Sequence, residues 1–259
     1  GLTLQYHVGG AFQELSPGVT ATDTFFYAMQ DGDGAQSTAQ VTISVTGVND
    51  APVAVADNVS VTEDGPPVSL NILSNDFDAD LGDSRTLLSL NLTGTKGVVT
   101  FQPDGIVEYS AGTAFNDLRA GVTAIDTFQY TISDQHGAVS TGTVRVTVTG
   151  QNDAPVAVAD AVTVTEDNVG HVIQVLQNDT DPDTGDTRRV QSINTNGLLG
   201  TVTIAANGAS VSYSAGSAFQ WLTAGQSQVE TFTYTMVDGT GLISSAIVTV
   251  TVTGWTDGA

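Results

Sequence analysis

The sequence predicts an all-β protein built from tandem two-sheet sandwiches, and three observations support this. The nine residues 49–57, Asn-Asp-Ala-Pro-Val-Ala-Val-Ala-Asp, return letter for letter at 152–160, 103 residues later. Apolar residues alternate with polar ones in long runs such as 144–149, which is the period of a strand with one buried face. Turn-forming segments such as 134–137 separate the runs. A repeat of this length is a whole domain, so we interpret the chain as part of a tandem array.

The chain of 259 residues divides into three repeats and a tail. Repeat A, residues 1–47, is the C-terminal half of a truncated unit. Repeat B, residues 48–150, and repeat C, residues 151–254, are complete, and residues 255–259 start the next linker. The assignment rests on recurring positions: Tyr6, Phe25, Tyr27 and Asp31 in repeat A, Tyr109, Phe128, Tyr130 and Asp134 in repeat B, and Tyr213, Phe232, Tyr234 and Asp238 in repeat C.

Each complete repeat has room for about seven strands with turns every 8–12 residues, which is typical of an Ig-like, Greek-key β-sandwich. The only helical pattern is short, at residues 114–118, and we expect a single turn that directs Phe115 and Leu118 inward. The predicted fold is therefore all-β, with tandem Greek-key β-sandwiches arranged as a rod.

The composition excludes several classes of partner. The chain has 28 acidic and 6 basic residues, a formal net charge of -22, so phosphate backbones and anionic lipid surfaces would repel it. No apolar run approaches the roughly 20 residues of a membrane span. We therefore expect neither nucleic-acid binding nor membrane insertion. The chain opens in mid-repeat at Gly1, so a missing signal peptide says nothing about export.

Two loops, 75–83 and 178–186, concentrate the acidic residues. The four aspartates, the asparagine and the glycine of the first loop match those of the second at an offset of 103, while the other residues change. Carboxylates at alternate positions, with a glycine that permits a sharp turn, supply the converging oxygens that Ca²⁺ prefers, since it takes about 6–8 such ligands. The alternative is a solvated acidic loop whose side chains form local Asx-turns.

Greek-key topology suggests which other residues meet these loops. The loop and the final hairpin turn lie at one end of a sandwich, the first turn lies at the other end, and the linker follows the last strand. We therefore expect calcium at the junctions between repeats. The candidate ligands are Asn49, Asp50, Glu63, Asp64, Asp76, Asp78, Asp80, Asp83, Asp134, Asn152, Asp153, Asp179, Asp181, Asp183, Asp186 and Asp238.

An enzymatic function is not expected, and we predict no catalytic residue. The three histidines, His7, His136 and His171, do not recur between repeats, and the chain has no cysteine. Trp221 occupies a loop position where the other repeats have Asp117 and Glu14. It could stack on a sugar or simply pack locally.

Three motifs together resemble a known family. They are Leu-x-Ala-Gly followed by Asp-Thr-Phe (118–128), Val-Thr-Gly-x-Asn-Asp-Ala-Pro-Val (148–156) and the Asn-Asp-x-Asp-x-Asp-x-Gly-Asp loop. The chain resembles the VCBS-type, cadherin-like repeats of giant RTX-type bacterial adhesins, which are secreted by type I systems and linked to biofilm formation. The Asn-Asp-Ala-Pro linker also looks like that of cadherins, where Ca²⁺ stiffens each junction. The sequence departs from that linker in having Gly47 and Gly150 where an aspartate is expected.

The resemblance implies an extracellular stalk segment at a bacterial cell surface, rigidified by Ca²⁺, that supports cell adhesion or biofilm formation. The partners that it implies are neighbouring repeats of the same chain and a cell-surface or matrix ligand. Two alternatives stay open. One is an adhesin module that binds glycans or another ligand. The other is a self-associating subunit in which strands of another chain complete repeat A.

Overall fold

The computed structural model describes residues 3–101 and 106–256, and this part of the chain is all-β. It contains sixteen strands, β1 to β16, and no helix. Residues 114–118 form turns in which the Leu118 N–H donates to the Phe115 carbonyl over 3.0 Å, and Phe115 is buried. The predicted all-β class is confirmed, and the short helical pattern is a turn.

The described chain separates into two compact units whose boundaries do not follow the repeats. Unit 1 comprises Gly1–Val61, Gly65–Gly112 and Ile125–Val148. Unit 2 comprises Thr62–Asp64, Thr113–Ala124 and Thr149–Ala259. Unit 2 therefore contains repeat C together with two short segments from within repeat B.

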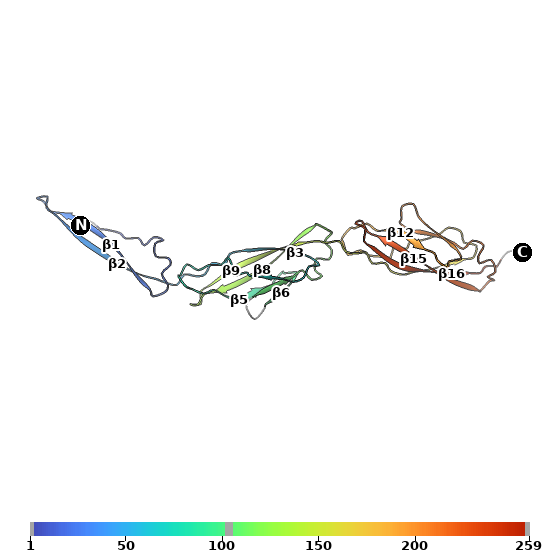
Figure 1. The fold of residues 1–259 in the computed structure, drawn as a ribbon, viewed down its shortest axis with the longest axis horizontal. Helices are drawn as coiled ribbons and strands as arrows, with labels where there is room; N and C mark the ends of the chain where they lie inside the picture. Colours follow the sequence, from blue (N-terminus) through green and yellow to red (C-terminus); the bar gives the residue numbers. More distant parts are fainter. Residues whose placement is uncertain (1–2, 102–105, 257–259) are drawn as a thin grey trace. The chain divides into compact units, whose positions relative to one another are not determined.

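Repeat C forms two sheets from seven strands. The strands are β10 (Asp160–Thr165), β11 (His171–Ile173), β12 (Arg189–Asn194), β13 (Thr201–Ile204), β14 (Val211–Ser214), β15 (Ser227–Val237) and β16 (Ile243–Thr253). One sheet has the order β10-β16-β15-β12 and the other β11-β14-β13. The first strand pairs in parallel with the last, and the other neighbours pair antiparallel. Figure 1 shows the long strands β15 and β16 side by side.

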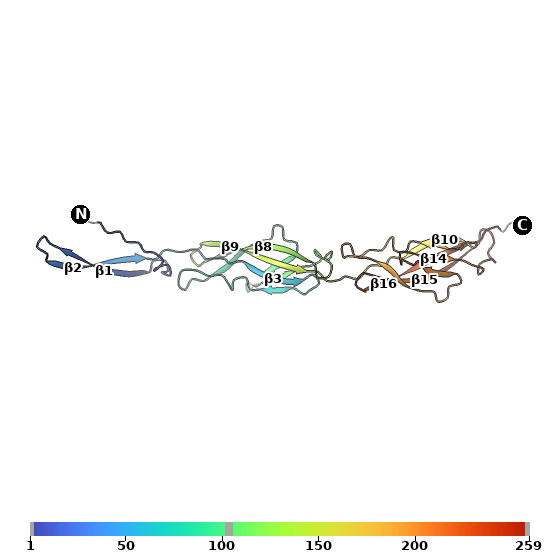
Figure 2. The ribbon, with the colours of Figure 1, turned by 90° about the horizontal axis from the view of Figure 1, so that it is seen from above.

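Repeat B repeats this order of strands. They are β3 (Asp57–Thr62), β4 (Val68–Leu70), β5 (Thr86–Asn91), β6 (Val98–Phe101), β7 (Val107–Ser110), β8 (Thr123–Ser133) and β9 (Val139–Thr149). Its sheets have the orders β3-β9-β8-β5 and β4-β7-β6, and β8 and β9 can be followed in Figure 2. Strand β5 has a register shift between Leu87 and Ser89, and β12 has the matching shift between Val190 and Ser192.

Repeat A contributes a two-stranded sheet of β1 (Thr20–Gln30) and β2 (Gln36–Thr46). Its apolar positions have no opposing sheet among the described residues. Tyr27 is 41% exposed, whereas Tyr130 and Tyr234 at the equivalent positions of repeats B and C are 0% exposed. The same sequence pattern is therefore buried only where both sheets of the sandwich are present.

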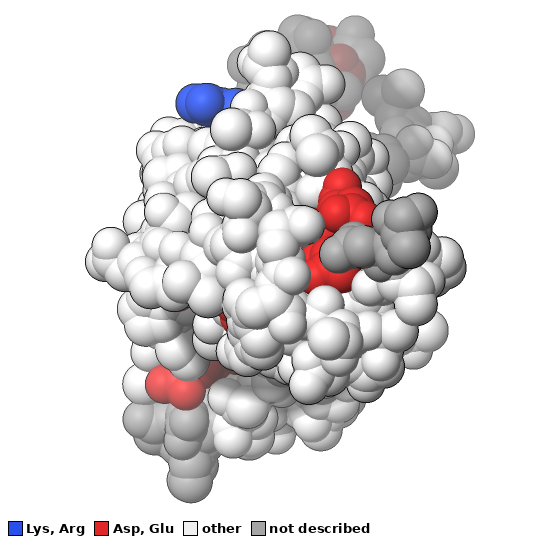
Figure 3. Space-filling model, turned by 90° about the vertical axis from the view of Figure 1, so that its right-hand side faces the viewer, with Lys and Arg blue, Asp and Glu red and all other residues white. Residues whose placement is uncertain are grey.

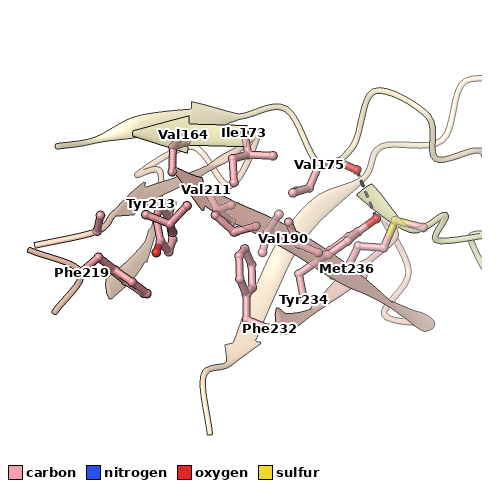
Figure 4. Close-up of a cluster of buried hydrophobic side chains, with 14 of the residues drawn as sticks. Val164, Ile173, Val175, Val190, Val211, Tyr213, Phe219, Phe232, Tyr234 and Met236 are labelled. Atoms are coloured by element: carbon pink, nitrogen blue, oxygen red, sulfur yellow. Dashed lines mark hydrogen bonds between the residues drawn. The ribbon is translucent and has the colours of Figure 1, made fainter. Parts of the chain in front are cut away.

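The core of repeat C lies between its two sheets. Alternate residues of β15, namely Phe232, Tyr234 and Met236, are buried against Val248 and Val250 of β16 and against the facing sheet. Figure 4 shows Phe232, Tyr234 and Met236 in this cluster, with the Tyr234 hydroxyl pointing to the Val175 carbonyl, 3.1 Å away. The alternation along each strand places its apolar side chains on one face, and burying that face supplies the main stabilisation of the sandwich.

A tyrosine and an acid 17 residues further along the chain form a hydrogen-bonded pair in every repeat. Tyr6 donates to Asp23 over 2.9 Å, and Tyr109 donates to the buried Asp126 over 2.8 Å. Tyr213 and Glu230 make the same pair in repeat C. In repeat B the Gly97 N–H also donates to Asp126, over 2.8 Å. A buried carboxylate is thus satisfied by donors from two other segments of the sandwich.

We expect Tyr234→Phe to destabilise the chain by about 1–3 kcal/mol, because buried polar groups lose their hydrogen-bond donor. The Tyr234 hydroxyl lies 2.8 Å from both carboxylate oxygens of Asp179. Tyr27→Phe is the matched control, since Tyr27 occupies the equivalent, exposed position of repeat A. Urea unfolding of both variants measures the difference, and equal losses would contradict this account of the core.

Candidate metal centre

The acidic loops connect β4 to β5 and β11 to β12, and each is tied to the linker that precedes its repeat. An isolated bridge joins Val53 to Phe77, and an equivalent bridge joins Val156 to Thr180. Gly82 and Gly185 have positive φ angles of 89° and 75°, a backbone region that glycine adopts without strain. The bridge and the turn together place the linker beside the aspartates.

In unit 1 the linker and the loop are joined through carboxylates. The Asn49 side-chain amide donates to Asp134 over 2.8 Å. The Asp50 N–H donates to Asp80 over 2.8 Å, and the Asp80 N–H donates to Asp78 over 3.0 Å. We call Asn49, Asp50, Asp78, Asp80, Asp83 and Asp134 the unit 1 cluster.

In unit 2 the equivalent residues make the same contacts. The Asn152 amide donates to Asp238 over 2.7 Å. The Asp153 N–H donates to Asp183 over 3.0 Å, and the Asp183 N–H donates to Asp181 over 3.0 Å. The unit 2 cluster comprises Asn152, Asp153, Asp181, Asp183, Asp186 and Asp238. Glu63, in the turn after β3 of repeat B, lies beside it, since burial and the nearby charges of Asp64, Asp153 and Asp183 raise its pKa.

Glu63 is 2% exposed and accepts a 2.5 Å hydrogen bond from the Gln151 N–H in the linker. Glu166 repeats this arrangement one repeat later, since it is 0% exposed and accepts from the Trp255 N–H over 2.7 Å. Glu166 is absent from the residues predicted as ligands, although its offset of 103 from Glu63 is a signal in the sequence.

Most of these residues use one side-chain atom in a hydrogen bond and keep a second, buried oxygen that accepts no hydrogen bond among the described residues. The oxygens are Asn49 Oδ1, Asp78 Oδ2, Asp80 Oδ1 and Asp83 Oδ2 in unit 1, and Glu63 Oε2, Asp153 Oδ2, Asp181 Oδ2 and Asp183 Oδ1 in unit 2. Buried polar atoms in folded proteins almost always have a partner. This donor set is all oxygen and largely anionic, so it fits a hard divalent cation such as Ca²⁺.

Within each cluster, three carboxylates offer oxygens that lie within 4.8 Å of one another. The groups are Asp78, Asp80 and Asp83 in unit 1, and Asp181, Asp186 and Asp238 in unit 2.

Figure 3 shows one face of the molecule on which acidic side chains gather in separate patches on a largely uncharged surface. The negative charge visible on that face is therefore localised.

The surroundings shift the pKa values of these acids in both directions. Burial raises the pKa of Asp153, as do the nearby charges of Asp64 and Asp183. The Asn49 hydrogen bond lowers the pKa of Asp134. Burial opposes the shift at Asp238, but hydrogen bonds from Asn152 and from backbone N–H groups lower its pKa. The hairpin-turn aspartates are thus held ionised, while Asp153 resists the loss of its proton.

Three of the predicted ligands, Asp64, Asp76 and Asp179, lie outside the unit 1 and unit 2 clusters and have other neighbours. Asp76 accepts hydrogen bonds from the Val55 N–H and the Tyr130 hydroxyl, over 2.7 and 2.8 Å. Asp179 makes the equivalent contacts in repeat C. Asp64 is exposed and raises the pKa of Asp153 through its charge. Asp76 and Asp179 thus connect the loops to the tyrosines of the core.

Asp83 has neighbours that the sequence pattern does not reveal. The Gln135 side chain donates to one of its oxygens, and the His136 ring nitrogen lies 3.8 Å from the other. Repeat C has Gly239 and Thr240 at these positions. The two clusters therefore share their ligand candidates but differ beside the last aspartate of the loop.

Gly47 and Gly150 depart from the cadherin linker for a steric reason. A Cβ atom on Gly150 would lie 2.3 Å from the Arg119 carbonyl oxygen, and one on Gly47 would lie 2.2 Å from the Leu15 carbonyl oxygen. No side chain fits at such distances. The turn that packs on the linker thus excludes an aspartate at this position.

Trp221 and Trp255 are exposed to 60% and 62%. The Trp221 indole N–H donates to the Ala218 carbonyl over 3.1 Å within its own turn.

In the described part of the chain there is no helix with the length and apolar character needed to cross a membrane.

The solved structures that match the chain include cadherins. The chain matches mouse clustered protocadherin PcdhgC3 EC1-3 with 16% identity and a TM-score of 0.49, over 95% of this chain and 80% of that one. It matches the protocadherin GammaB4 extracellular domain with 20% identity and a TM-score of 0.48, over 93% of this chain and 39% of that one. It matches Drosophila N-cadherin EC1-4 with 17% identity and a TM-score of 0.34, over 93% of this chain and 60% of that one. The chain therefore spans less than two thirds of the last two structures.

No curated protein matches the sequence. The family model of the bacterial cadherin-like domain matches twice, at residues 49–150 and 152–254. Cadherin-like domains are generally extracellular adhesion modules that bind Ca²⁺ and are typically not enzymes. Together the two matches cover most of the sequence, so the chain belongs to the bacterial cadherin-like domain family.

Proposed function

We propose that this chain is a structural extender segment of a bacterial cell-surface adhesin, and that Ca²⁺ at its acidic clusters holds successive repeats in a fixed orientation. The function is mechanical, and the protein is not an enzyme. The family match supports an adhesion or extender role. The proposal that the clusters bind calcium rests on the buried oxygens in both clusters that accept no hydrogen bond.

The unit 2 cluster would hold Ca²⁺ through residues of two repeats. Glu63 comes from repeat B, while Asp153 and Asp183 come from the linker and repeat C. An ion bound to all three would connect the two repeats through charged ligands. Since Ca²⁺ takes about 6–8 oxygens, the adjacent Asp181, Asp186 and Asp238 can complete one or more coordination shells.

The unit 1 cluster would bind Ca²⁺ in a similar way through Asn49, Asp78, Asp80 and Asp83. Without a cation, carboxylates this close together repel one another. Binding removes that repulsion and stabilises the folded chain by mass action. The junctions would thereby become stiffer as the Ca²⁺ concentration rises, which suits a spacer in the extracellular medium.

We expect Asp183→Asn to lower the Ca²⁺ affinity of the unit 2 cluster by about tenfold or more, because ligand charge tunes affinity at such sites. Asp31→Asn is the matched control, since Asp31 is the repeat A counterpart of Asp134 and Asp238 and lies outside both clusters. Isothermal titration calorimetry measures affinity and stoichiometry. Absence of Ca²⁺ binding by the unmodified chain would reject the calcium proposal.

The mechanical part has a separate readout. Small-angle X-ray scattering with Ca²⁺ and with a chelator should give a longer maximum dimension and a narrower distribution of distances in Ca²⁺, because the junctions bend less. If the chain binds Ca²⁺ but has the same distance distribution with Ca²⁺ and with chelator, the metal site is supported and the stiffening role is rejected.

Asp181 gives a prediction of pH dependence. Its pKa is raised by burial and by the charges of Asp186, Asp183 and Asp238, against a backbone hydrogen bond that lowers it. The folded chain therefore keeps this proton to a higher pH than the unfolded chain, and the associated stability is lost as pH rises through the folded-state pKa. In metal-free protein, Asp181→Asn should stabilise the chain at pH 7 and not at pH 3.5.

In saturating Ca²⁺ at pH 7, Asp181→Asn should instead be less stable than the unmodified chain, because the variant lacks a charged ligand for the ion. Urea unfolding of both proteins, dialysed free of metal and then with Ca²⁺ added, measures the two differences. An Asp181→Asn variant that is no more stable than the unmodified chain at pH 7 without metal would show that repulsion at Asp181 is negligible.

A further inference from the structure

A turn of repeat B contacts the acidic loop of repeat C within unit 2. The Thr184 N–H donates to the Asp117 carbonyl over 3.1 Å. The Thr184 carbonyl accepts a hydrogen bond from Arg119 Nε over 2.7 Å. Both main-chain polar groups of Thr184 are therefore hydrogen-bonded to the preceding repeat.

The same pair of contacts recurs in unit 1. The Leu81 N–H donates to the Glu14 carbonyl over 3.1 Å, and the Leu81 carbonyl accepts from the Ser16 hydroxyl over 2.9 Å. Leu81 and Thr184 are equivalent at an offset of 103, as are Ser16 and Arg119. The contact is thus a property of successive repeats, made in two places with different donor side chains.

The contact lies directly beside the candidate metal ligands. Thr184 and Gly185 separate Asp183 from Asp186, and the Asp186 N–H donates to the Asp183 carbonyl over 3.1 Å. A Cβ atom on Gly185 would lie 2.4 Å from an Arg119 guanidinium nitrogen, so the guanidinium rests against the backbone of the loop. Arg119 therefore helps to position the loop without being a ligand.

We propose that this two-bond contact, the junction clasp, joins successive repeats independently of metal, and that Arg119 is a positioning residue for the unit 2 cluster. The clasp fixes the segment between Asp183 and Asp186 before an ion binds. Formation of the clasp and binding of the ion are thermodynamically coupled. If the clasp increases the metal affinity by some free energy, metal binding stabilises the clasp by the same free energy.

The exchange of Ser16 for Arg119 between junctions supplies a matched pair of variants. Arg119→Ser keeps a side-chain donor of the kind that repeat A uses, and Arg119→Ala removes it. Both variants lose the positive charge, so electrostatic effects on the acidic cluster cancel when the two are compared. Arg145→Ala is the control for charge alone, since Arg145 lies on β9 in unit 1.

Amide hydrogen exchange of the full metal-free chain tests the clasp without reference to calcium. The Thr184 amide should be protected, and Arg119→Ala should speed its exchange by about tenfold, the effect of losing one hydrogen bond. Arg119→Ser should restore part of the protection, and Arg145→Ala should leave it unchanged. A Thr184 amide that exchanges as fast as an unprotected one would overturn the proposal, as would equal rates in the Ser and Ala variants.

Calcium titration of the same variants tests the coupling. Arg119→Ser should bind Ca²⁺ at the unit 2 cluster a few-fold more tightly than Arg119→Ala, while the unit 1 cluster binds equally in both. Equal affinities at unit 2 would mean that the clasp does not position the metal ligands. If no variant binds Ca²⁺, the proposed calcium function fails, whereas the exchange experiment still decides whether the clasp exists.

Discussion

The clusters depend on one constraint: carboxylates are held by backbone N–H donors in positions where their remaining oxygens are buried and face other acids. Asp80 is fixed by the Asp50 N–H, and Asp183 is fixed by the Asp153 N–H. Because the donors belong to the linker, the linker cannot move without moving these carboxylates. If the acids of the loop could rotate freely, they would turn outward and so reduce their mutual repulsion. The hydrogen bonds from the linker prevent this rotation, so a bound cation is the remaining way to neutralise the repulsion.

Much of the architecture could be predicted from the sequence, because the alternation within strands and the spacing between repeats indicate the same fold. Alternation along Val144, Val146 and Val148 predicts a strand with one buried face, and the structure buries all three. The offset of 103 predicts equivalent loops, and Asn49 and Asn152 make equivalent contacts with Asp134 and Asp238. The division of Asp76 from Asp78 was not predictable, because alternation in a loop does not show which side chains turn toward a tyrosine. The Tyr–acid pairs were detectable, since Tyr109 and Asp126 recur together at constant spacing.

Other features depend on contacts between segments far apart in sequence. The requirement for glycine at position 150 comes from a carbonyl 31 residues earlier in the chain, at Arg119. The environment of Asp83 depends on Gln135 and His136 in the final hairpin turn. The clasp involves main-chain groups of Asp117 and Thr184, which carry no signature in side-chain type. Repetition identifies positions that matter, but it does not show which atoms meet.

The composition of unit 2 bears on how such a chain can be dissected. Residues 62–64 and 113–124 of repeat B belong to the same compact unit as repeat C. A recombinant fragment that starts at residue 151, where the sequence repeat starts, would lack Glu63 and the donor at Arg119. Its behaviour in isolation would therefore misrepresent that of the same residues in the array. A fragment meant to represent repeat C in the array therefore has to include repeat B as well.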